Sequence, residues 1–242
     1  MPALLLGGFA YLMMGAVSLA CALFLADLWL PQTIDRGSWP SLAWPAAAAI
    51  DAALLALFGL QHSVMARAGF KAWLHRMVPP PLERAVYVIA SSLALGLLLG
   101  VWQPIPAMIW QVHSPPGAEL LWGVYGAGWL LVLASTWMID HYELFGLAQV
   151  WRSFRGLPAP PEDFRTPYLY RYVRHPLYLG WLLVFWATPA MSAGHLLFAA
   201  GMSVYILIGM AHEERDLLRL FGDAYRSYRA RVPALIPGLK LR

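Results

Sequence analysis

Long apolar runs alternate with short polar stretches along the chain. Four of these runs occupy residues 3–30, 41–66, 85–101 and 120–139. The hydrocarbon core of a bilayer is about 30 Å thick, and roughly 20 apolar residues in a helix cross it. The pattern therefore predicts four membrane-spanning helices in the first part of the chain.

A fifth apolar run, residues 176–211, is longer and is interrupted twice. The interruptions are Thr188-Pro189 and Ser192-Ala193-Gly194, both typical of turns. They predict a tight hairpin of two short helices, each only just long enough to span. The whole chain is therefore expected to cross the membrane about six times.

Composition supports a membrane protein and excludes several other classes. Of the 242 residues, 60% are hydrophobic and 12% are charged, whereas a soluble domain has about 45–50% apolar and about 25% charged residues. A soluble globular domain, a disordered chain and a nucleic-acid-binding protein are all excluded. We expect an all-α fold, a polytopic membrane helix bundle that forms a single domain over residues 1–242.

Cysteine and histidine usage argues against a metal site. The single cysteine, Cys21, allows neither an intramolecular disulfide nor a cysteine-ligated metal centre. The seven histidines include no His-x-x-x-His pair, which a membrane di-iron oxygenase needs. We therefore expect no metal cofactor.

Basic residues are distributed unequally between the two sides of the expected bundle. Sixteen of the seventeen Lys and Arg residues lie between spans two and three, between spans four and five, or after span six; only Arg36 lies on the other side. Cytoplasmic loops carry an excess of basic residues, so both termini are expected to be cytoplasmic, in a bacterial inner membrane. Contact with lipid headgroups accounts for most of these residues individually.

An amphipathic segment follows the sixth span. Apolar residues recur there at helical spacing among arginines and acids, namely Leu217, Leu218, Phe221, Ala224, Tyr225 and Tyr228. The pattern predicts a C-terminal amphipathic helix that lies at the cytoplasmic interface.

Polar side chains that can do chemistry collect in three clusters at the cytoplasmic ends of the spans. The first comprises residues 61–63 with Arg67, and the second residues 140–143. The third joins residues 170–180 to residues 212–214, which the hairpin should place side by side. Interfacial anchoring is the alternative explanation for any single residue, because Tyr, Trp and Arg collect at membrane boundaries.

The third cluster resembles a known superfamily. Residues 174–180 read Arg-His-Pro-Leu-Tyr-Leu-Gly, Glu213 and Glu214 follow about thirty residues later, and residues 221–233 read Phe-Gly-x-x-Tyr-x-x-Tyr-x-x-x-Val-Pro. Over residues 164–237 this pattern resembles the isoprenylcysteine carboxyl methyltransferase and phospholipid methyltransferase superfamily.

Upstream motifs narrow the resemblance. Residues 61–67 read Gln-His-Ser-Val-Met-Ala-Arg, residues 78–84 Val-Pro-Pro-x-Leu-Glu-Arg, and residues 141–150 His-Tyr-Glu-Leu-Phe-Gly-Leu-x-Gln-Val. They resemble the bacterial membrane-bound methanethiol S-methyltransferases. A sister group, a nitric-oxide-metabolism-associated membrane family, shares the first of these motifs, which is therefore the least diagnostic.

The resemblance implies that S-adenosylmethionine binds at the cytoplasmic ends of the last spans, in a cofactor-binding half over residues 140–237. The cofactor's ribose diol needs a carboxylate acceptor, which Glu213 or Glu214 can supply. Its amino-acid end needs hydrogen-bond donors, for which the candidates are Arg174, His175 and the helix-start amides around Pro176. The remaining candidates are Tyr170 and Tyr178 against the adenine or ribose, Phe164, Arg165 and Thr166 at the adenine edge, and Gln149 in the 141–150 motif.

One departure from the superfamily bears on the methyl acceptor. Its prenylcysteine enzymes place an arginine about one turn before the acidic pair, facing the carboxylate of the substrate. Here residues 208–212 read Ile-Gly-Met-Ala-His, without an arginine. This absence disfavours a carboxylate-bearing acceptor, and the resemblance implies methylation of a small neutral thiol, methanethiol, to dimethyl sulfide. Methylation of a prenylcysteine or lipid headgroup, or a non-catalytic transporter or scaffold, are the alternatives.

Methylation of a thiol needs a group that takes the thiol proton. Asp51 and His62 lie on one face of the second span, and Tyr87 lies near the depth of His62 on the third. Ionisable groups inside a membrane span are functional candidates by default. Asp140 and His141, at the end of the fourth span, are the rival pair, and interhelical hydrogen bonding is the structural alternative. A tyrosine-plus-acid relay is the favoured interpretation.

Overall fold

The computed structural model describes residues 1–37, 39–161 and 163–239. Two of the basic residues counted above, Lys240 and Arg242, lie outside the described residues. The elements, in chain order, are α1 (Pro2–Leu25), α2 (Trp44–Met65), α3 (Ala68–Leu74), η1 (Pro80–Leu82), α4 (Glu83–Val101), β1 (Met108–Gln111), α5 (Pro115–Ile139), α6 (His141–Leu144), α7 (Leu147–Arg155), η2 (Tyr168–Arg171), α8 (Pro176–Trp186), β2 (Ala190–Ser192) and α9 (Ala193–Arg231).

Five of the described helical segments are long and apolar enough to cross a membrane. They are α1, α2, the continuous segment Pro80–Val101, α5 and α9. The protein is therefore an integral membrane protein, and the predicted all-α, polytopic fold is confirmed. The only strands among the described residues, β1 and β2, form a two-stranded sheet beside the helices.

The hairpin of the last two spans differs in detail from the expectation. Helix α8 has only 11 residues, so at 1.5 Å per residue it is about 16 Å long, roughly half the thickness of the hydrocarbon core. Helix α9 has 39 residues and is not short. The chain has no helix breaker between Gly209 and Gly222, so the apolar helix continues directly into the charged segment that was expected to be a separate helix.

Gly222 ends this continuous segment. Its backbone has φ 51° and ψ −122°, so α9 consists of two helical pieces joined at a bend. A residue with a Cβ atom rarely adopts such a positive φ. The predicted amphipathic segment therefore divides at Gly222, and only the part that follows it turns in a new direction.

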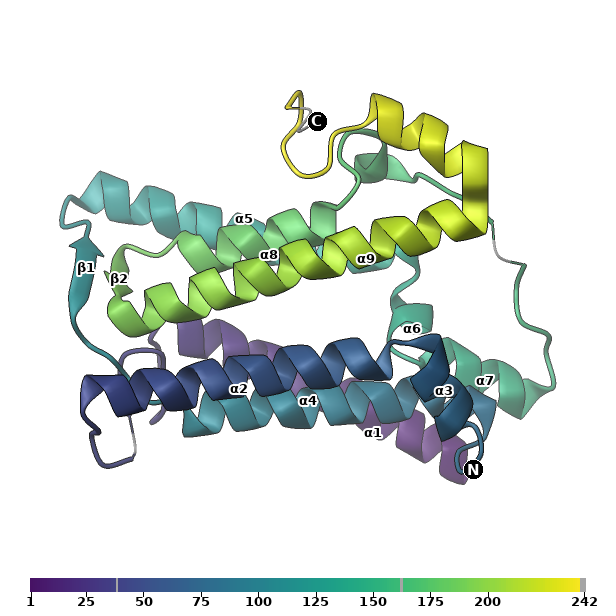
Figure 1. Cartoon of the computed structure of the whole chain (residues 1–242), viewed down its shortest axis with the longest axis horizontal. Helices are drawn as coiled ribbons and strands as arrows, with labels where there is room; N and C mark the ends of the chain where they lie inside the picture. Colours follow the sequence, from purple (N-terminus) through teal and green to yellow (C-terminus); the bar gives the residue numbers. More distant parts are fainter. Residues whose placement is uncertain (38, 162, 240–242) are drawn as a thin grey trace. The chain divides into compact units, whose positions relative to one another are not determined.

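The chain divides into two compact units. The first contains Met1–Ile109, His141–Pro160 and Met191–Phe198, and the second contains Trp110–Asp140, Pro161–Ala190 and Ala199–Arg242. In the first unit α1 packs on α4 and α7, and α2 packs on α4 (Figure 1). One part of its core is built from Ala10, Ala85 and Val88, and another from the buried rings of Phe24, Trp102 and Phe198.

Close helix packing organises the second unit, in which α5, α8 and α9 lie side by side (Figure 1). Gly128 on α5 faces Gly180 on α8, and a Cβ atom on Gly180 would lie 2.9 Å from the Gly128 carbonyl oxygen. Small residues allow membrane helices to approach this closely. Helices α8 and α9 are joined by a hydrogen bond from Trp186 Nε1 to Ser203 Oγ (2.9 Å), and this pairing brings the start of α8 to the charged part of α9.

Candidate active site

A buried carboxylate with three basic partners forms the centre of the candidate site in the second unit. Glu214 on α9 accepts a hydrogen bond from Arg174 Nε (2.8 Å) and lies 3.1 Å from His175 Nε2. Its other oxygen is 3.3 Å from Arg229 Nε. The Glu214 side chain is only 11% exposed. Each partner compensates part of the desolvation cost of this carboxylate. Glu214 therefore holds Arg174, His175 and Arg229 together.

The turn before α8 is held in place by the chain's C-terminal segment. The backbone N–H groups of Arg174 and His175 donate to the carbonyl oxygens of Pro233 (2.9 Å) and Ala234 (3.0 Å). Arg174 also donates to the Val232 carbonyl oxygen. His175 is the residue before helix α8, and Pro176 begins the helix, where its missing N–H costs nothing. The Arg-His-Pro turn therefore depends on the segment that follows Gly222.

The neighbouring acid, Glu213, has very different surroundings. Its side chain is 46% exposed, and its Oε2 lies 3.8 Å from His175 Nδ1. The Tyr178 hydroxyl donates a hydrogen bond of 2.7 Å to the same oxygen, and the Tyr178 ring stacks on the His175 ring with centroids 5.4 Å apart. Glu213 is therefore oriented by its neighbours but keeps an accessible carboxylate.

Aromatic side chains border this charged cluster. Phe164 contacts the rings of Phe221, Tyr225 and Tyr228, with centroids 5.2–5.8 Å apart. The Tyr228 hydroxyl donates to the Tyr170 carbonyl oxygen. Burial raises the pKa of the Tyr170 phenol above its ordinary value, and the nearby Glu213 charge raises it further. Tyr170 is therefore a neutral phenol at physiological pH.

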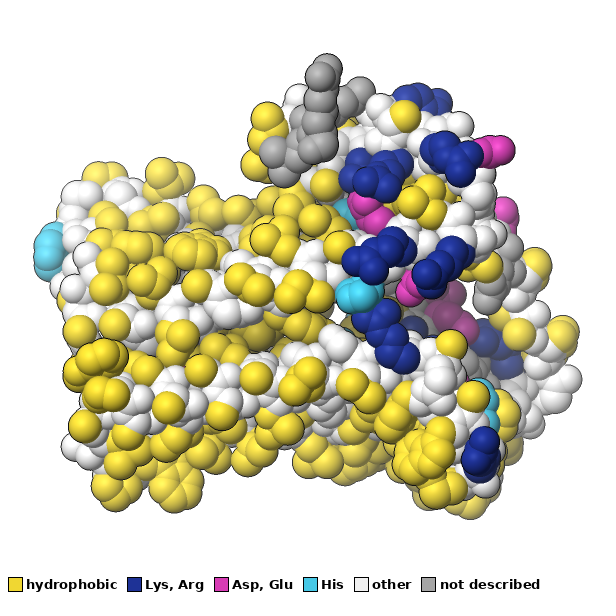
Figure 2. All heavy atoms as spheres, in the orientation of Figure 1, with side chains coloured by type: hydrophobic (Ala, Val, Ile, Leu, Met, Phe, Trp, Pro, Cys, Tyr) yellow, Lys and Arg dark blue, Asp and Glu magenta, His cyan; other side chains and the backbone are white. Residues whose placement is uncertain are grey.

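Charged side chains of the second unit gather over the C-terminal half of α9. Figure 2 shows Lys, Arg, Asp and Glu side chains concentrated there, whereas the rest of the visible face of α8 and α9 is hydrophobic or uncharged. The candidate site thus lies where α9 changes from an apolar helix to a charged one.

Two of the residues expected to bind cofactor have hydrogen-bond or ion-pair partners that do not belong to this charged cluster. Arg165 is exposed and pairs with Asp163 at 3.3 Å. Gln149 belongs to the first unit, on α7, where its Nε2 donates to the Glu143 carbonyl oxygen (2.9 Å). The Gln149 Oε1 atom is enclosed and has no hydrogen-bond partner among the described residues. Gln149 lines a hollow of about 310 Å³, and the other lining residues are Pro80, Pro81, Arg152, Ser153, Leu157 and Ala159.

The first unit contains a polar pair on α2 and α4. His62 Nδ1 lies 3.1 Å from Ser91 Oγ, and the Tyr87 hydroxyl approaches the His62 carbonyl oxygen at 3.4 Å. The His62 and Tyr87 rings are 4.9 Å apart between centroids. The sequence placed His62 and Tyr87 at similar depth but did not single out Ser91, an isolated hydroxyl in an apolar run.

Asp51 lies at the other end of α2. It is fully buried, and its Oδ1 accepts a 2.8 Å hydrogen bond from the Gln103 backbone N–H. Eleven residues separate it from His62 on one continuous helix, which is about 16 Å at the helical rise. Asp51 therefore does not share a site with the His62–Tyr87 pair; it binds the chain where α4 ends.

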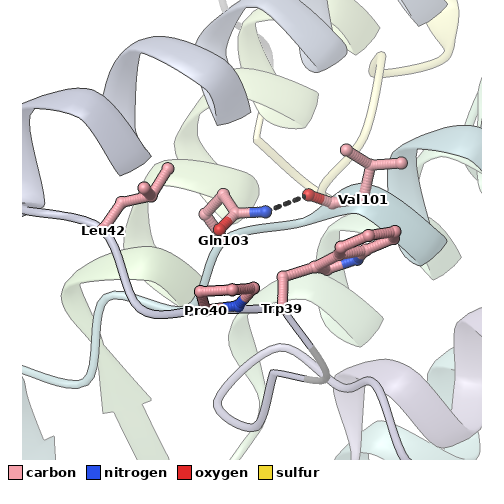
Figure 3. A pocket seen from close by; sticks show the side chains of 5 residues that line it. All are labelled: Trp39, Pro40, Leu42, Val101 and Gln103. Carbon is pink, nitrogen blue, oxygen red and sulfur yellow. Dashed lines mark hydrogen bonds between the residues drawn. The ribbon is translucent and has the colours of Figure 1, made fainter.

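A surface hollow of about 280 Å³ lies at this same end of the first unit. Its lining consists of Trp39, Pro40, Leu42, Val101 and Gln103, and Figure 3 shows the Gln103 side chain directed toward Val101. The Gln103 Nε2 atom donates to the Val101 carbonyl oxygen at 2.8 Å. The described residues that line it are mostly apolar, and none of them has an ionisable side chain.

The rival acid and histidine fall in different units. Asp140 is the residue that follows α5, in the second unit, and its N–H donates to the Thr136 carbonyl oxygen. His141 is buried in the first unit, where its Nε2 lies 2.8 Å from the Tyr11 hydroxyl. Tyr11 could not be found from the sequence because nothing distinguishes it within an uninterrupted apolar run.

Comparison with known proteins identifies the family. The chain is 50% identical over 235 residues to Methanethiol S-methyltransferase 1 of Bradyrhizobium diazoefficiens. The matched region covers 97% of this chain and 82% of that protein. The chain is 48% identical over 218 residues to the Methanethiol S-methyltransferase of Pseudomonas deceptionensis, with 89% and 82% covered. Nurim of Homo sapiens is a more distant relative, 34% identical over 208 residues, with 82% and 76% covered.

No protein-family model and no solved structure matches the chain. The identification of the family therefore depends on these relatives, and it agrees with the resemblance inferred from the sequence motifs. The chain belongs to the family of methanethiol S-methyltransferases.

Proposed function

We propose that this protein is a membrane enzyme that transfers a methyl group from S-adenosylmethionine to methanethiol and forms dimethyl sulfide. The observation that carries the proposal is its identity of about one half, over most of the chain, to proteins named for this reaction. The cluster of Glu213, Glu214, Arg174 and His175 supports it as the place for the methyl donor.

The two acids have different roles in this proposal. Glu214 has three basic partners and holds the turn, whereas Glu213 has an accessible carboxylate that can accept both hydroxyls of a ribose. Arg174 is engaged by Glu214 and by backbone carbonyls. Its contribution is to position the start of α8, whose first N–H groups are the donors for a carboxylate.

The residues present fit S-adenosylmethionine in the chemistry of their donor and acceptor groups. Glu213 can accept hydrogen bonds from the ribose hydroxyls. His175 precedes α8, and Pro176 and Tyr178 belong to its first turn. The aromatic and polar groups of Phe164, Arg165, Thr166 and Tyr170, together with Gln149, remain the candidates for contacts with the base. When bound, S-adenosylmethionine supplies an electrophilic methyl carbon attached to a positively charged sulfur.

The protein's own chemical task is to remove the thiol proton. The sulfur of methanethiol forms the new bond to carbon as a thiolate, the old carbon–sulfur bond breaks with its electron pair staying on the donor's sulfur, and the thiol proton passes to the protein. We place the acceptor at His62, with Ser91 fixing the imidazole and Tyr87 beside it. His141 with Tyr11 and neighbouring Asp140, or Asp51, are the rivals.

An apolar surrounding favours this reaction. The thiolate and the sulfonium carry opposite charges that cancel as the methyl group moves, so a dry site lowers the barrier. Methanethiol is small and apolar enough to reach the reaction centre through the bilayer. The proposed location is the bacterial inner membrane, with both termini in the cytoplasm, because sixteen of the seventeen basic residues belong to segments that the sequence predicts on one side of the membrane.

Headspace gas chromatography of expressing cells fed methanethiol tests the proposal. We expect dimethyl sulfide to accumulate above the level of cells that carry the empty vector. Methylation of farnesylcysteine or phosphatidylethanolamine without dimethyl sulfide would assign a different acceptor. Failure of the purified protein to bind S-adenosylhomocysteine would favour a transporter or scaffold.

A further inference from the structure

Arg84 in the first unit carries a positive charge that no protein group compensates. It ends the motif of residues 78–84, to which the proposed function gives no role, and lies partly buried in the first turn of α4. Two other cations of this unit, Lys71 and Arg152, pair with glutamates. Among the described residues, no carboxylate pairs with the Arg84 guanidinium and no acceptor takes a hydrogen bond from it. An anion that enters from outside would therefore be stabilised there.

The guanidinium lies beside the pair of side chains proposed for proton transfer. Its Cζ is 5.6 Å from the centroid of the Tyr87 ring, and Tyr87 lies about one helical turn further into the span than Arg84. The Tyr87 ring contacts the His62 ring, and the Arg84 charge acts electrostatically on His62. An arginine that reaches for lipid headgroups extends away from the bilayer centre. Arg84 instead brings its charge to the His62–Tyr87 pair.

The motif of residues 141–150 holds the first part of this side chain in place. Gly146 has φ 88°, which a residue with a Cβ atom rarely adopts. A Cβ atom there would lie 3.0 Å from the Ala85 backbone nitrogen and 3.2 Å from the Arg84 Cγ. The glycine therefore lets this segment pass directly against the first turn of α4, and the two motifs meet at Arg84.

A place with these neighbours suits a small acceptor that becomes an anion. His62, Tyr87 and Arg84 are each partly exposed, and methanethiol has a carbon and a sulfur as its only non-hydrogen atoms. When the S–H bond breaks, the electron pair stays on the sulfur and the proton passes to the imidazole. The thiolate is attracted by a nearby positive charge, and the attraction is strongest where water is scarce.

We propose that the Arg84 guanidinium binds the sulfur of methanethiol and stabilises the thiolate that forms when the imidazole of His62 takes its proton. The inference rests on the proposed function and adds a residue that contacts the reacting sulfur. The same positive charge repels a protonated imidazole, so it favours the proton transfer only when the sulfur is closer to Arg84 than the imidazole is. The sulfur therefore belongs on the Arg84 side of the Tyr87 ring.

The matched variants are Arg84→Gln and Arg155→Gln. Arg155 belongs to the same unit and also lies over an aromatic ring, 5.5 Å from the centroid of Trp151, but it has no part in the proposed site. Arg84→Gln should lower the turnover of methanethiol about 100-fold, as does the loss of one group that stabilises a developing negative charge. Its unfolding temperature and its affinity for S-adenosylhomocysteine should stay near wild type, because no ion pair within the protein is lost. Arg84→Lys keeps the charge and should restore most of the turnover.

The experiment compares turnover of methanethiol and of trifluoroethanethiol by the purified protein and the three variants in lipid nanodiscs. The fluorine atoms make the second thiol more acidic, so its thiolate needs less stabilisation and the loss in Arg84→Gln should be clearly smaller. Normal turnover in Arg84→Gln, or an equal loss with both thiols, overturns the inference and leaves the proposed function intact. An equal loss in Arg155→Gln also overturns it and assigns Arg84 to contact with lipid headgroups. A wild-type protein that forms no dimethyl sulfide overturns the proposed function as well.

Discussion

Glu213 and Glu214 are adjacent in the chain but differ in what a substitution would remove. Glu214 is nearly enclosed and compensates three basic groups, whereas Glu213 is half-exposed and accepts the Tyr178 hydroxyl. Breaking a buried ion pair by removing one partner costs about 3 kcal/mol or more, because it leaves an uncompensated charge behind. Exposed carboxylates contribute far less to stability.

We therefore expect Glu214→Gln to lower the free energy of unfolding by about 3 kcal/mol. Glu213→Gln should leave stability within about 0.5 kcal/mol of wild type but weaken S-adenosylhomocysteine binding by about tenfold or more. Thermal unfolding and calorimetry on the two variants measure these effects. Equal stability loss in both, or unchanged affinity in Glu213→Gln, would show that the division of roles is wrong.

Substitution of His62 tests which group accepts the thiol proton. If His62 takes the thiol proton, His62→Gln should reduce turnover by about 100-fold, which is the usual contribution of a general base. Affinity for S-adenosylhomocysteine should stay near wild type, because no cofactor contact is removed. The matched control is His141→Gln, which disrupts the Tyr11 pair instead. Normal turnover in His62→Gln with loss in His141→Gln would transfer the role to His141.

Several site residues could not be foreseen because their role depends on contacts distant in sequence. Arg174, His175 and the acidic pair were predictable from the hairpin, since its two arms must return to the same depth. Arg229 reaches Glu214 only because the chain bends at Gly222. Tyr11 carries no local signal at all, and only the packed structure reveals its bond to His141.

Helix packing in the second unit depends on two glycines. A Cβ atom at Gly180 would lie 2.9 Å from backbone atoms of Gly128 and Val132, which cannot move without separating α5 from α8. We expect Gly180→Ala to lower the free energy of unfolding by about 1–3 kcal/mol. Thermal or denaturant unfolding in detergent measures this change.

Gly126, on the exposed side of α5, is the matched control for this substitution. A Cβ atom there meets nothing within 4 Å, so Gly126→Ala should be neutral or should stabilise the helix by up to about 1 kcal/mol. A neutral Gly180→Ala would mean that the two helices are not in backbone contact.

Hydropathy located the helices but not how they join. The apolar runs predicted α1, α2, α4 and α5 because a bilayer requires a minimum apolar length. The same apolar pattern predicts two short helices of similar length for the last two spans, whereas α8 has 11 residues and α9 has 39. Hydropathy indicates whether a segment lies in the bilayer, but it does not show where a helix ends. The charged residues that follow the apolar run therefore gave no sign that α9 continues through them.

The orientation of the whole molecule is a separate prediction. Sixteen of the seventeen basic residues belong to segments that the sequence predicts on one side of the membrane, and cytoplasmic loops carry such an excess. We expect a fluorescent protein fused to the C-terminus to be bright and a periplasmic phosphatase fused there to be inactive. A fusion within the loop between α1 and α2 is the control and should behave in the opposite way. Reversed activities would contradict the proposed orientation.

Transfer of a labelled methyl group by the purified protein tests the central claim most directly. The protein, reconstituted in lipid nanodiscs, is supplied with methanethiol and with S-adenosylmethionine whose transferable methyl group is fully deuterated. Headspace mass spectrometry should detect dimethyl sulfide carrying one deuterated methyl group, formed at the wild-type rate by Gly126→Ala and far more slowly by Glu213→Gln. Absence of the labelled product from wild-type protein that binds S-adenosylhomocysteine would contradict methanethiol as the acceptor.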